Sequence, residues 1–73
     1  MEKQELFGEI GNLYYSLEEQ IENQEQLDTD NEVLNETLRE LQYHTRLMLN
    51  KRINEYAEKY GQKDIKEFSK YYV

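Results

Sequence analysis

Few residues in the sequence have types and spacings that could do chemistry. Glu40 and His44 lie four residues apart, which would put a carboxylate and an imidazole on the same face of a helix. Di-iron helical bundles instead place glutamate and histidine three residues apart, and they use two copies of that pair. Because only one pair is present and its spacing differs, we interpret Glu40 and His44 as a surface pair.

Two further patterns do not match the metal site or the catalytic site that they resemble. Residues 28–32 (DTDNE) alternate oxygen ligands as a calcium loop does, but Val33 stands where the sharp turn needs glycine, and no bidentate glutamate follows at the required distance. Ser16, Ser69 and His44 form no nucleophilic triad, and the absence of cysteine removes thiolate chemistry. We therefore expect no metal, no cofactor and no enzyme activity.

Apolar residues at three- and four-residue spacing predict the helices that position all other side chains. The first helix should span 3–26 and present one apolar stripe, about a third of its circumference wide. A second stripe predicts a helix over 30–60. The first stripe consists of Leu6, Phe7, Ile10, Leu13, Tyr14, Leu17 and Ile21, and the second of Leu34, Leu38, Leu41, Thr45, Met48, Leu49, Ile53, Tyr56 and Tyr60.

Local signals predict where these helices begin and end. Thr29 and Glu32 have the spacing of a capping box, in which each side chain bonds the other residue's backbone amide, so the second helix should begin there. Gly61 suits the left-handed conformation that follows a helix C-terminus. A short third helix is expected over 64–72. Its apolar side would consist of Ile65, Phe68 and Tyr72.

These elements predict an all-α fold in a single domain, residues 1–73. A short turn between two striped helices forces them antiparallel, which gives a helical hairpin. Two helices cannot enclose a core, so the third helix folds back on them, and we expect dimerisation to complete the bundle. Tyr43 and Leu47 lie one turn apart, off the main stripe, and are the residues expected to contact the third helix, a second copy or another protein.

Acidic residues are concentrated in the first part of the chain. Residues 1–28 contain eight acids and one base, whereas residues 51–73 contain four acids and six bases. In a hairpin, the end of the first helix lies beside the start of the second, so acids from both converge on one end. Acids near a helix C-terminus oppose the helix dipole, so stability alone does not explain them; the alternative is a solvated face that serves solubility. The candidate binding acids are Glu18, Glu19, Glu22, Glu25, Asp28 and Glu36.

Tyr15 is the candidate aromatic anchor beside these acids. Tyrosine offers a large contact area and has only two torsions to immobilise, which suits interfaces. Tyr15 is predicted to share the face opposite the core stripe with Gly8 and Gly11. Each glycine costs ~1 kcal/mol relative to alanine in a helix, so the pair either admits the close approach of a partner or simply loosens the first turns.

Composition narrows the partners and the compartment. The formal net charge of −7 and the small, offset set of C-terminal lysines argue against direct binding of nucleic acid. No apolar run approaches the ~20 residues of a membrane span, and residues 1–5 do not resemble a signal peptide. We therefore expect no membrane contact and a cytoplasmic location.

The sequence thus predicts a small acidic protein that binds a basic surface of a larger protein, for which a nucleic-acid-binding surface is one candidate. Occluding that surface would make it an inhibitor or regulator. The expectation rests on shape and charge, by analogy with small phage- and plasmid-encoded inhibitors. The alternative is a structural or chaperone-like module that binds its partner through an apolar face.

Overall fold

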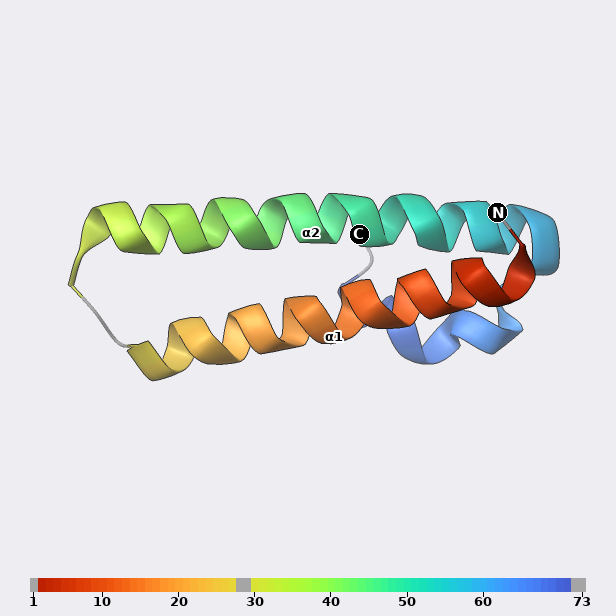
Figure 1. Ribbon diagram of the computed structural model, residues 1–73, viewed down its shortest axis with the longest axis horizontal. Coiled ribbons are helices and arrows are strands. Elements are labelled where there is room, and N and C mark those ends of the chain that lie inside the picture. Colours follow the sequence, from red (N-terminus) through yellow and green to blue (C-terminus); the bar gives the residue numbers. More distant parts are fainter. Residues whose placement is uncertain (1, 28–29, 72–73) are drawn as a thin grey trace.

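The computed structural model describes residues 2–27 and 30–71 of the chain. It contains two long α-helices, α1 (Lys3–Leu27) and α2 (Glu32–Tyr60), and one 3-10 helix, η1 (Lys63–Tyr71). α1 and α2 lie side by side and antiparallel, and η1 packs beside the N-terminal half of α1 (Figure 1). The described part of the chain is therefore all-helical, as predicted, and forms an elongated hairpin of 44 × 20 × 16 Å.

The start of α2 differs from the prediction. Asn31 is the N-cap, and its side-chain oxygen accepts a hydrogen bond of 3.1 Å from the backbone N–H of Leu34. Glu32 is then the first helical residue, so it does not occupy the third helical position that a capping box requires. The predicted capping box is wrong in this respect, and its other member, Thr29, lies outside the described residues.

The end of α2 at Gly61 is confirmed. The Gly61 backbone has φ 86° and ψ 177°, and its N–H donates a 3.0 Å hydrogen bond to the carbonyl of Ala57. This combination of angles lies outside the left-handed helical region that the sequence suggested, and it is accessible almost only to glycine. Gly61 therefore allows the chain to turn back towards α1.

η1 winds more tightly than the α-helix expected for this segment. With three residues per turn, positions three apart share one face. Ile65, Phe68 and Tyr71 consequently point the same way: the first two are buried and Tyr71 is half-buried. The prediction assumed α-helical spacing and gave the third apolar position to Tyr72, which lies outside the described residues.

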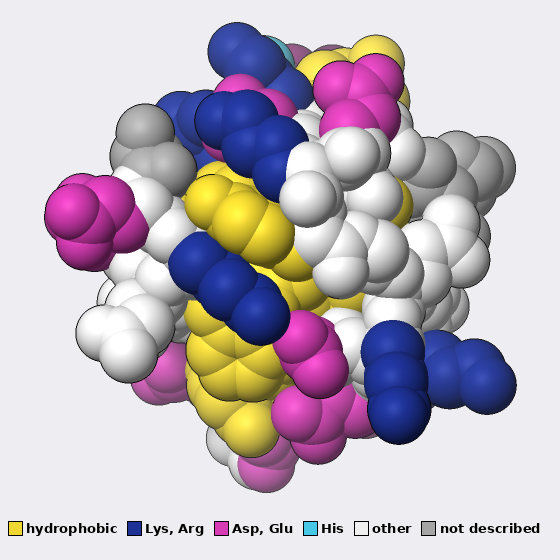
Figure 2. Space-filling view, turned by 90° about the vertical axis from the view of Figure 1, so that its right-hand side faces the viewer, with side chains coloured by type: hydrophobic (Ala, Val, Ile, Leu, Met, Phe, Trp, Pro, Cys, Tyr) yellow, Lys and Arg dark blue, Asp and Glu magenta, His cyan; other side chains and the backbone are white. Residues whose placement is uncertain are grey.

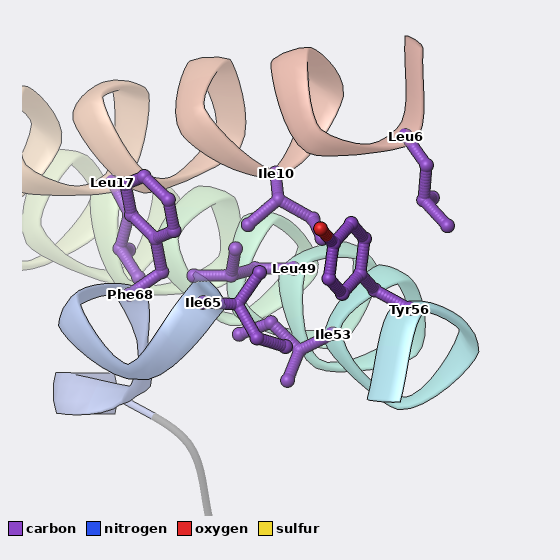
Figure 3. Packing of buried hydrophobic residues seen from close by; sticks show 8 residues of the cluster. All are labelled: Leu6, Ile10, Leu17, Leu49, Ile53, Tyr56, Ile65 and Phe68. Carbon is purple, nitrogen blue, oxygen red and sulfur yellow. The ribbon is translucent and has the colours of Figure 1, made fainter. Parts of the chain in front are cut away.

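The core lies at one end of the hairpin. We call this the closed end: the end at which α1 begins and α2 ends, and where η1 packs against both. Side chains from all three helices converge there (Figure 3). The buried apolar cluster consists of Leu6, Ile10, Leu17, Leu49, Ile53, Tyr56, Ile65 and Phe68.

Phe68 attaches η1 to α1. Its ring meets those of Phe7 and Tyr14 edge-on, at centroid distances of 5.6 Å and 5.3 Å. A Cβ atom added at Gly11 would lie 3.9 Å from Cζ of Phe68, so Gly11 faces η1. The prediction that Gly11 lies opposite the core is therefore wrong, and the close approach at this glycine comes from the same chain. Nothing lies within 4 Å of a Cβ atom added at Gly8.

Part of the predicted core of α2 is exposed. Leu34, Leu41 and Met48 are 38%, 50% and 52% exposed. One neighbouring helix covers only one side of α2, and η1 covers a second side only at the closed end. The predicted stripe is thus wider than the surface that the chain itself can cover.

Candidate protein-binding surface

The two ends of the hairpin differ in charge. We call residues 19–27 of α1 together with residues 30–39 the acidic end. It contains six acids and one base, Arg39. The acids are Glu19, Glu22, Glu25, Asp30, Glu32 and Glu36.

Four of the predicted binding acids are solvent-exposed at this end: Glu19, Glu22, Glu25 and Glu36. In the described part of the chain, every ion pair lies elsewhere, and none involves an acid of the acidic end. The remaining predicted acid of this region, Asp28, lies outside the described residues. The exposed carboxylates are therefore not neutralised by cations of the described chain.

The local helix geometry adds to this negative potential. The last turn of α1 contains no basic residue, so its free carbonyl groups and the nearby Glu22 and Glu25 have the same sign. Asp30 and Glu32 are placed more favourably, because they lie at the N-terminus of α2. The arrangement on α1 is therefore unfavourable for helix stability, because Glu22 and Glu25 lie near the negative end of the helix dipole.

Glu18 has a different environment from the other predicted acids. Its carboxylate accepts a 2.9 Å hydrogen bond from the hydroxyl of Tyr71, and Nζ of Lys70 lies 3.7 Å from its other oxygen. Hydrogen bonding from Tyr14 and Tyr71 lowers the pKa of Glu18. Glu18 thus ties η1 to α1 inside the chain, and the sequence pattern did not separate it from its neighbours.

Tyr15 is 64% exposed and lies just before the acidic end. Its ring contacts Tyr14 edge-on, with centroids 5.5 Å apart, and lies 6.4 Å from the ring of Phe68. Glu19 and Glu22 follow it at four- and seven-residue spacing, so the three side chains share one face of α1. An exposed aromatic ring therefore adjoins the free carboxylates, as the predicted binding surface requires.

Polar side chains join the two helices at and beside the acidic end. Gln20 donates a 3.1 Å hydrogen bond to the hydroxyl of Thr45, and Gln42 donates to the side-chain oxygen of Gln24. Ile21 packs against the apolar cluster here, but none of the cluster's buried members lies within residues 19–27 or 30–39. With few buried apolar contacts, the acidic end should open locally at a lower free energy than the closed end.

Tyr43 and Leu47 are exposed on α2, by 59% and 48%. η1 packs into the core through Ile65 and Phe68 at the closed end, and it leaves Tyr43 and Leu47 uncovered. The alternative in which the third helix covers them within one chain is therefore wrong. Leu41 and Met48, predicted as core, are exposed in the same part of α2 and enlarge the apolar area there.

The closed end has a hollow of about 450 Å³, lined by Lys3, Gln4, Phe7, Tyr56 and Asp64. Its polar groups bond one another: Lys3 lies 3.6 Å from the carboxylate of Asp64, which also accepts a 3.0 Å hydrogen bond from Tyr56. Seen onto this end, basic and acidic side chains are mixed around an apolar centre (Figure 2). The hollow offers no concentration of one charge comparable to that of the acidic end.

A salt bridge also joins the two long helices near the closed end. Nε of Arg52 lies 2.8 Å from a carboxylate oxygen of Glu9, and Nη1 lies 3.1 Å from Glu55. Across residues 2–27 and 30–71, no group of three or more metal-ligating side chains could hold an ion. Within the same residues, no helix combines the length and apolar character needed to cross a bilayer.

Comparisons with protein-family models, with curated proteins and with solved structures find no match to this chain.

Proposed function

We propose that this chain is a small protein-binding protein whose acidic end docks on a basic surface of a larger protein and occludes it, as an inhibitor or regulator does. The observation that carries the proposal is the set of exposed carboxylates at one end of the hairpin, which have no cationic partner in the described chain. A sequence selected for stability alone would pair these charges or disperse them.

The acids and the aromatic ring would have separate roles in binding. An exposed ion pair contributes only ~0–1 kcal/mol, so the carboxylates mainly accelerate and orient the encounter. Tyr15 would then supply the buried contact that slows dissociation, because aromatic side chains dominate the energetics of interfaces. Glu19 and Glu22 share one face of α1 with Tyr15, so one partner surface could contact all three side chains.

A groove that binds nucleic acid is the favoured class of target. Such grooves concentrate lysine and arginine to neutralise phosphates, and a clustered row of carboxylates matches that positive potential. The protein would compete with nucleic acid for the groove without binding nucleic acid itself.

The exposed apolar residues of α2 support a second candidate function. Leu41, Leu47 and Met48 could bind a partner as a structural or chaperone-like module does, with charge serving solubility. They could also complete the predicted homodimer, which remains a proposal.

Salt separates the two candidate functions. The partner is captured from the native host on the immobilised chain and identified. The association rate and affinity of the purified partner for the chain are then measured at increasing ionic strength. Docking through the acidic end predicts association that slows steeply with salt. Affinity that is insensitive to salt would favour the apolar surface.

A further inference from the structure

The outer face of α2 carries an apolar patch with one charged residue at each end. All of its members are exposed, and they lie on the side turned away from the residues of α2 that enter the core, Leu49, Ile53 and Tyr56. We call this set the outer face of α2; it consists of Glu40, Tyr43, His44, Leu47, Met48 and Lys51.

The spacing of this face is that of a helix-pairing seam. Glu40, His44, Leu47 and Lys51 follow one another at intervals of four, three and four residues, which keeps them in line along a helix. Tyr43 adjoins this line and adds apolar area beside it. A second helix can therefore lie along the face over about three turns.

The order of charges along the face is self-complementary. Along the sequence, the midpoint between Glu40 and Lys51 falls between residues 45 and 46. The midpoint between His44 and Leu47 falls at the same place. In an antiparallel pair of helices related by a two-fold axis at that point, each residue faces its counterpart across the midpoint. Glu40 of each copy then faces Lys51 of the other.

We propose that the outer face of α2 is the site where a second copy of this chain binds, with the two α2 helices antiparallel and crossing near residues 45–46. The symmetry produces the Glu40–Lys51 pair twice, once at each end of the contact. Tyr43, His44 and Leu47 lie between the two ion pairs, where their apolar surfaces are removed from water.

Neither charged residue is otherwise engaged. Within residues 2–27 and 30–71, the ion pairs involve other side chains, and both Glu40 and Lys51 are exposed. Because the contact involves one helix of each copy, it is at the small end of specific interfaces, and we expect association in the micromolar range. The proposal does not depend on the acidic end, whose acids lie outside this face.

The test is a charge swap read by analytical ultracentrifugation over a hundredfold range of concentration. Glu40→Lys and Lys51→Glu should each raise the dimer dissociation constant about tenfold or more, because each breaks two attractions and places like charges opposite each other. The double variant Glu40→Lys/Lys51→Glu should restore the wild-type constant. It has the same net charge as the wild type, so a change in general repulsion cannot explain the restoration.

Matched controls are Glu5→Lys and Lys59→Glu, which make the same charge changes at exposed positions outside the face. They should shift the constant by less than the corresponding single variants. Circular dichroism establishes that each variant keeps its helix content. A wild-type chain that is monomeric throughout overturns the proposal, as does a dimer that the single variants leave unchanged or that the double variant fails to restore.

Discussion

Replacing Gly11 with alanine should stabilise the protein, although Gly11 faces η1. A glycine inside a helix costs about 0.8–1.0 kcal/mol relative to alanine, because its backbone loses more freedom on folding. The added methyl group would lie 3.9 Å from Cζ of Phe68, which is ordinary van der Waals contact. The gain in helix propensity is therefore not offset by a clash, and we expect about 1 kcal/mol.

Gly8→Ala is the matched variant, because nothing lies within 4 Å of the added atom and only helix propensity changes. For a chain of this size, ~1 kcal/mol raises Tm by about 4–8 °C. Both variants should show this rise when helix content is followed by circular dichroism during heating, at one fixed protein concentration.

A lower Tm for Gly11→Ala together with a higher one for Gly8→Ala would refute the packing of η1 described above. Binding of the alanine variants to the partner provides a second measurement. If Gly8, which no other part of the described chain approaches, admits a binding partner closely, alanine there should weaken the complex while the free protein becomes more stable.

Two other predictions concern the attachment of η1. Phe68→Ala should lower the free energy of unfolding by about 3–5 kcal/mol, since the ring is buried among aromatic neighbours. This is a large part of the roughly 4–11 kcal/mol expected for the whole chain. A loss below about 1 kcal/mol in urea unfolding would contradict the prediction. Glu18→Gln should destabilise the protein at neutral pH. Because hydrogen bonding lowers the pKa of Glu18 in the folded state, its stabilising effect is present above the ordinary value of 4.5 and is lost as the pH falls through the lower folded value. The difference in stability between wild type and variant should accordingly shrink in acid, and a difference independent of pH would argue against the Glu18 contacts.

The sequence was sufficient for the helical fold because hydrophobic periodicity and Gly61 are local signals. Periodicity could not show which part of a stripe is covered, because that depends on the neighbouring helices. Leu41 and Met48 belong to the predicted stripe of α2, yet they are exposed since η1 packs only at the closed end.

Only part of the candidate site could be predicted from the sequence, because the rest depends on contacts between helices. The excess of acids near one end follows from counting charges along a hairpin, and Glu19, Glu22 and Glu25 are exposed there. The role of Glu18 depends on where Tyr71 returns in space, and that position is set by the 3-10 winding of η1. A helical wheel with α-helical spacing cannot place that contact.

The acidic end is tested most directly by reversing its charges and measuring association with the purified partner. The variant Glu19→Lys/Glu22→Lys/Glu25→Lys is compared with a control that makes the same change in net charge at three exposed positions near the closed end. The control acids are Glu2, Glu5 and Glu67.

We predict that reversal at the acidic end slows association sharply and flattens the dependence of the association rate on salt. The control variant should keep most of the wild-type association rate and most of its salt dependence, because steering depends on where the charges lie. Helix content should be maintained, since the variant relieves like-charge repulsion near the end of α1. Equal effects of the two variants, or none from either, would contradict docking through the acidic end.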